Sequence, residues 1–105
     1  MDNPRIEALQ SMLAQDPDNI FPRYGLAMEY ARTGQLEEAS AEFKKLLEAN
    51  ENYAAGYFHG GQTLEKLGRI EEAKALYERG IEVTTKSNDA HTRAELQGAL
   101  DLLPI

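Results

Sequence analysis

Apolar positions recur along this chain at spacings of three and four residues, which is the period of an α-helix. Near the start, Ile6, Leu9 and Met12 form such a stripe, and no segment shows the strict alternation of a strand. The pattern therefore predicts an all-α protein of about six helices. We expect them over residues 4–15, 20–33, 36–49, 53–67, 70–84 and 89–103.

Polar and special residues mark the expected ends of these helices. Asn3 precedes Pro4, and Asn19 follows the Asp-Pro-Asp run at 16–18. Asparagine accepts hydrogen bonds from free N–H groups at a helix start, and proline is tolerated in the first turn. Gly34 and Gly68 follow apolar stripes directly, so we expect each to end a helix in the left-handed conformation.

The chain also contains an internal repeat. Residues 34–39 (GQLEEA) return 34 residues later as residues 68–73 (GRIEEA), and Phe43 returns as Tyr77. A fixed period of this length is typical of stacked helical hairpins. Because only a few residues connect successive helices, neighbours in sequence should pack antiparallel.

The period and the spacing of small and aromatic residues resemble those of the tetratricopeptide repeat. That family pattern reads roughly Trp-x2-Leu-Gly-x2-Tyr, then Ala-x3-Phe, then Pro. The matching residues of the two complete units are Leu26, Ala27, Tyr30, Gly34, Ala39 and Phe43, then Tyr57, Gly61, Gly68, Ala73 and Tyr77. Departures include Arg23 in a Trp position and Gly60 in a Leu position, where we expect a local dent or a flexible helix.

The resemblance implies a right-handed superhelical stack of antiparallel helix hairpins in a single domain, residues 1–105. Residues 4–19 would form a leading half-repeat, 20–53 and 54–87 two full repeats, and 88–105 a C-terminal capping helix. The same alignment places His91 in the Trp position of the last unit.

In this family the first helix of each unit lines a concave groove that binds other proteins. The alignment implies a groove formed by Phe21, Tyr24, Met28 and Arg32, then Phe58, Gln62 and Lys66, then Thr92 and Leu96. An apolar, partly aromatic groove with cationic edges suits a peptide or an amphipathic helix of a partner protein. Two alternatives stay open, namely self-association through this face and packing within the chain.

Composition narrows the functional classes. The chain has no cysteine and two distant histidines, His59 and His91, so the sequence suggests no metal, no cofactor and no catalytic site. The net charge of −7 disfavours nucleic acid. No apolar run reaches the length that membrane insertion needs, and the start does not resemble a signal peptide, so we expect a cytoplasmic protein.

The sequence thus predicts a non-enzymatic adaptor or scaffold that binds a protein or peptide partner. The alternative is a structural protein that assembles with copies of itself. The last helix motivates this alternative, because its leucines fall on more than one face: Leu96, Leu100, Leu102 and Leu103. Exposed apolar surface of this kind marks an interface, so a homo-oligomer is a second expectation.

Overall fold

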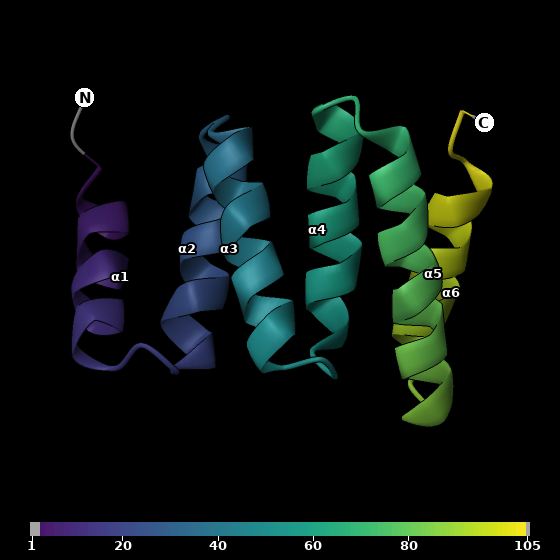
Figure 1. Cartoon of the computed structure of the whole chain (residues 1–105), viewed down its shortest axis with the longest axis horizontal. Helices are drawn as coiled ribbons and strands as arrows, with labels where there is room; N and C mark the ends of the chain where they lie inside the picture. Colours follow the sequence, from purple (N-terminus) through teal and green to yellow (C-terminus); the bar gives the residue numbers. More distant parts are fainter. Residues whose placement is uncertain (1–2, 105) are drawn as a thin grey trace.

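The computed structural model describes residues 3–104 of the chain, and this part contains six helices. They are α1 (Pro4–Gln15), α2 (Ile20–Arg32), α3 (Leu36–Ala49), α4 (Ala54–Lys66), α5 (Ile70–Lys86) and α6 (Ala90–Asp101). Figure 1 shows them as a row of sequential hairpins, with α1 at one end and α5 and α6 at the other. The all-α hairpin stack is confirmed. Residues 1, 2 and 105, the ends of the predicted domain range, lie outside the described residues.

The predicted end signals act as expected. The Asn3 side chain accepts hydrogen bonds from the N–H groups of Arg5 and Ile6, and Asn19 accepts one from Phe21. Gly34 and Gly68 adopt φ values of 82° and 78° after the last turns of α2 and α4. Only glycine enters this region without steric cost. This is why the first helix of each repeat ends at the same position of the repeat.

The end of α5 differs from the prediction. This helix continues to Lys86 rather than Thr84, and Asn88, two residues after its end, has a φ of 59°. Asparagine tolerates the left-handed region better than other non-glycine residues, so it replaces the glycine used earlier. The N-caps Asn19 and Tyr53 are 34 residues apart, whereas Tyr53 and Asp89 are 36 apart. The last helix is therefore shifted by two residues against the 34-residue period.

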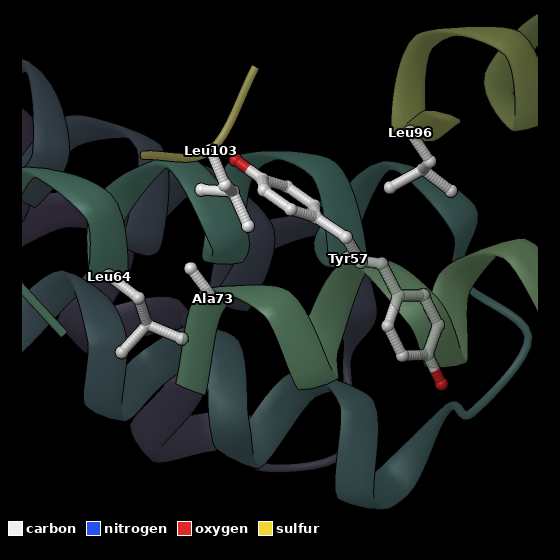
Figure 2. Packing of buried hydrophobic residues seen from close by; sticks show 6 residues of the cluster. Tyr57, Leu64, Ala73, Leu96 and Leu103 are labelled. Atoms are coloured by element: carbon white, nitrogen blue, oxygen red, sulfur yellow. The ribbon is translucent and has the colours of Figure 1, made fainter. Parts of the chain in front are cut away.

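The core consists of clusters that follow one another along the stack. One of them joins α4, α5, α6 and the segment after α6 through Tyr57, Leu64, Ala73, Tyr77, Leu96 and Leu103 (Figure 2). Another joins α2 and α3 through Ala27, Ala39, Phe43 and Leu46. A small residue lies beside a large one in each hairpin, and this allows the helices to approach closely.

The prediction of Leu96 as a groove residue is wrong. Leu96 is 0% exposed, and it packs beside Gly80, where an added Cβ would lie 2.9 Å from the leucine. Leu96 is therefore a core residue and not a groove residue. The two-residue shift explains the error, because Leu96 occupies the apolar core position of its helix. Leu103 is also buried, and Leu102 is 84% exposed.

The contacts between hairpins define the curvature of the stack. Residues of α2 and α4, and of α4 and α6, approach within 8 Å between Cα atoms, whereas the backbones of α3 and α5 do not come this close in the described part of the chain. The first helices of the hairpins thus lie closer together than the second helices. It follows that the face formed by α2 and α4 is the concave one, and the face formed by α3 and α5 is the convex one.

Candidate partner-binding groove

A hollow of about 200 Å³ lies on the concave face, between the C-terminal halves of α2 and α4. It is lined by Met28, Ala31, Arg32, His59, Gln62, Thr63 and Lys66. These residues combine a thioether, two cations, an amide and an imidazole, and no carboxylate is among them. The hollow offers hydrogen bonds and positive charge to a group that enters it.

Aromatic side chains lie toward the N-terminal ends of the same two helices. The Tyr24 ring lies 5.1 Å from the Tyr53 ring and 6.2 Å from the His59 ring, and Phe58 lies edge-on to His59 at 5.3 Å. Such tilted and edge arrangements are the favourable ones for aromatic pairs. Tyr24 and Phe58 are half-buried, because one side of each ring packs on the core. Phe21 is different, since it is 73% exposed.

Arg32, one of the two cations of the hollow, is held in place by the buried carboxylate of Glu29. Glu29 is only 5% exposed, and it accepts hydrogen bonds from the guanidinium of Arg32 and the amide of Asn3. Those hydrogen bonds lower the pKa of Glu29 from 4.5 to about 2, with Arg32 as the largest cause. Arg5 lies 3.4 Å from the same carboxylate. Glu29 therefore fixes the position of Arg32 and also ties the start of α1 to α2.

The surroundings of His59, which lines the hollow, favour its neutral imidazole. Burial lowers its pKa, and the negative charge of Glu95 on α6 opposes part of this effect. Glu95 itself lies 3.7 Å from His91, one helical turn earlier. Glu95 is therefore an α6 side chain whose charge acts on the groove residue His59.

The structure brings together four of the predicted groove residues, Met28, Arg32, Gln62 and Lys66, at one hollow. Phe21, Tyr24 and Phe58 lie toward the other end of the same helices. Thr92 does not line the hollow; it is half-buried in the first turn of α6, where its N–H donates to Asp89.

Three residues that line the hollow were missed from the sequence, namely Ala31, His59 and Thr63. Most of the predicted groove residues on α2 and α4 are four positions apart, as in Tyr24, Met28 and Arg32. This spacing follows only one edge of a helix face. A helix face also includes the positions at a spacing of three. Adding those positions to Met28 and Gln62 would have included Ala31 and His59.

A second hollow, of about 470 Å³, lies on the convex face between α3 and α5. Its walls include Leu47, Leu64 and Leu76, and Gly60 lies among its lining residues. This is the dent expected at Gly60, where the family pattern has leucine. Leu76 partly occupies the space, because a Cβ added at Gly60 would lie 3.0 Å from it.

The described residues 3–104 hold no cluster of three or more His, Asp or Glu side chains suited to a metal ion. Within the same range, every helix is too short or too polar to cross a bilayer.

Family models for the tetratricopeptide repeat match residues 6–60 and residues 54–86. A TPR repeat-containing protein of Pseudomonas aeruginosa, PA0015, is 29% identical over 87% of this chain and 87% of its own length. The solved tetratricopeptide repeat domain protein of Salinibacter ruber is 35% identical, covers 81% of this chain and 86% of that one, and has a TM-score of 0.75.

The TPR2B domain of yeast Sti1, solved as a complex with pHsp70, has the same fold at 16% identity. Its TM-score is 0.84, with 90% of this chain and 76% of that chain covered. The first family match covers more than half of the chain, and the 34-residue period, the glycine stops and the small–aromatic packing agree with it. The chain belongs to the tetratricopeptide repeat family, whose domains are protein-interaction modules.

Proposed function

We propose that this chain is an adaptor or scaffold that holds a peptide or helix of a partner protein on its concave face. The contact residues would be Phe21, Tyr24, Met28, Arg32, Phe58, Gln62 and Lys66. The observation that carries this proposal is the exposure of Phe21. A phenylalanine that leaves 73% of its surface in water contributes little to its own fold, and it lies on the same helix as the residues of the hollow.

The half-buried rings beside it support the same function. Aromatic side chains are enriched at the centres of protein interfaces, because they bury a large area at little cost in side-chain entropy. Tyr24 and Phe58 are already fixed on one side by the core, so a partner would meet rings that are ordered in advance. The yeast Sti1 domain, which has the same fold, forms a complex with pHsp70.

The proposal includes the unit organisation expected from the sequence. Residues 20–53 and 54–87 would act as two repeats, with 4–19 and 88–105 as flanking halves of one domain. It also places the protein in the cytoplasm and assigns it binding without catalysis. Cell fractionation tests the first of these assignments.

Affinity capture with matched variants tests the groove. We expect Phe21→Glu with Phe58→Glu to lose the partner proteins that the wild type captures from lysate, while the helical circular dichroism spectrum is kept. The control is Met12→Glu, because Met12 is an exposed apolar residue of α1, away from the hollow. Retention by the double variant, or an equal loss by the control, would contradict the proposal.

Self-assembly is the second candidate, and the 84% exposure of Leu102 favours it. The rest of the outward face of α6 argues against self-assembly, because its exposed residues include the polar side chains of Arg93, Gln97 and Asp101. Such faces suit a terminal helix that stays in water. Light scattering over a range of concentrations separates the two candidates. A constant monomer mass favours the adaptor, and a mass that rises with concentration and falls in Leu102→Glu favours self-assembly.

A further inference from the structure

The convex hollow between α3 and α5 has an equivalent place one repeat earlier, between α1 and α3. Residues 34 positions apart correspond in the repeat, so Leu26 corresponds to Gly60, and Ile6 corresponds to Ser40. Leu26 is 4% exposed and packs in one cluster with Ile6 and Leu9. Two large apolar side chains thus fill the earlier place, whereas glycine and serine leave the later one open.

The walls of the two places also differ in polarity. In the earlier one, Arg23 donates a 2.7 Å hydrogen bond to Glu42. Their counterparts 34 residues later are Tyr57 and Leu76, which both line the hollow. The Tyr57 hydroxyl donates to the backbone carbonyl of Glu51 at 2.6 Å, so its ring is the part left for a ligand. An ion pair in the first repeat is therefore replaced by two apolar surfaces in the second.

The inner part of the hollow is apolar and large enough for a ligand. Its volume of about 470 Å³ falls within the range of small-molecule sites, roughly 300–1,000 Å³. Its buried and half-buried lining residues are almost all apolar, namely Phe43, Leu47, Tyr57, Gly60, Leu64 and Leu76. Moving an apolar group from water onto such a surface is favourable.

The charged residues of the hollow are all exposed, and their signs balance: Lys44, Glu48, Glu72 and Arg79. A charged ligand gains no net attraction from them, and it loses hydration when it enters the apolar part. A protein partner is disfavoured too. The exposed large apolar side chains of the described residues are Met12, Phe21 and Leu102, and none of them lines this hollow.

We propose that the convex hollow is a binding site for a neutral small molecule with an aliphatic or aromatic body. The body packs against Leu64 and Leu76 beside Gly60, and Ser40 offers its hydroxyl to a polar group of the ligand. This site goes beyond the proposed function and does not depend on it, because partner binding is proposed for the opposite face.

The probe is 1-octanol, titrated into the isotopically labelled full chain and followed by NMR. We expect saturable shifts at the amides of Ser40, Leu47, Gly60 and Leu76. Octanoate and octylammonium carry a charge on the same carbon chain, and each should bind about tenfold more weakly because its headgroup loses hydration. Shifts that do not saturate, or a charged analogue that binds as tightly as octanol, would overturn the proposal.

Ala75→Trp is the blocking variant. Ala75 is exposed and lines the hollow, so an indole at this position should occupy the space without disturbing the core. The matched control is Ala41→Trp, 34 residues earlier, at an exposed position outside the lining. We expect Ala75→Trp to weaken octanol binding about tenfold or more and Ala41→Trp to leave it unchanged. Circular dichroism checks that both variants stay helical.

Leu76→Glu provides a second, independent change, because it introduces the acid that the first repeat has at Glu42. This variant should bind octylammonium more tightly than octanol, since the acid adds a negative charge to the wall. Octanol binding that survives both Ala75→Trp and Leu76→Glu would overturn the inference. That result would leave the proposed partner binding on the concave face untouched.

Discussion

Gly60 and Gly61 are adjacent in α4, yet their surroundings differ. A Cβ at Gly61 would lie 2.2 Å from the ring of Tyr77, which is fully buried and donates a hydrogen bond to Glu65. A Cβ at Gly60 would lie 3.0 Å from the end of the Leu76 side chain and 3.3 Å from the Cβ of Phe43. Close helix approach therefore requires glycine at position 61, whereas Gly60 opens the convex hollow.

The space around two helical glycines, Gly61 and Gly98, predicts opposite effects of Gly→Ala changes on stability. Gly61→Ala should cost about 1–3 kcal/mol, because the Tyr77 ring must move out of a packed site. Gly98→Ala should instead stabilise the protein by about 0.5–1 kcal/mol, since nothing lies within 4 Å of its added Cβ and alanine favours a helix. Urea unfolding followed by circular dichroism measures both. Equal effects of the two changes would contradict the assigned packing.

Glu29 predicts a pH dependence of stability. Its pKa is about 2 in the folded chain and about 4.5 when unfolded, so its ionised form favours folding above pH 5. That contribution is lost as the pH falls from about 5 toward 2. Glu29→Gln should therefore be less stable than the wild type at pH 7, with a difference that shrinks toward pH 2. Thermal unfolding across this range tests it, and a difference independent of pH would contradict the assigned network.

At the scale of elements, caps and stops made most of the fold predictable. The starts of α1 and α2, and the ends of α2 and α4 just before Gly34 and Gly68, could be derived from single residues. The end of α5 could not, because Asn88 is a weaker signal than glycine and the 34-residue period suggested an earlier stop. The two-residue shift then misplaced Leu96.

The candidate groove was predictable to a similar degree. A repeat alignment identifies the helix face, so Met28, Arg32, Gln62 and Lys66 came out around one hollow. Side-chain burial depends on neighbouring elements, which a local pattern does not contain. That is why the half-buried state of Tyr24 and Phe58, and the role of His59 between them, required the structure.

The attachment of α1 also yields a prediction. Asn3 caps the helix and donates a 3.1 Å hydrogen bond to Glu29, so Asn3→Ala should cost about 1–2 kcal/mol. Amide hydrogen exchange should speed up in α1 while α4 and α5 stay protected, because hairpins contact only their neighbours. Asn52→Ala, at an exposed turn residue, is the control. Equal exchange of α1 in both variants would contradict the capping role.

At the scale of the whole molecule, the stack presents two faces with different chemistry. The described chain measures 37 × 28 × 19 Å, and its two hollows lie on opposite sides. The hollow on the concave face is lined by the cations Arg32 and Lys66 and by no carboxylate. Both acids and bases line the convex hollow, as with Lys44, Glu48 and Glu72. We therefore propose that partners bind on the concave side.

Chemical-shift mapping by NMR tests this assignment most directly. The labelled protein is titrated with a partner protein identified by the affinity capture described above. We expect the largest shifts at Phe21, Met28, Phe58, Gln62 and Lys66, on α2 and α4. Shifts centred instead on Leu47, Leu76 and Arg79, around the convex hollow, would contradict the account.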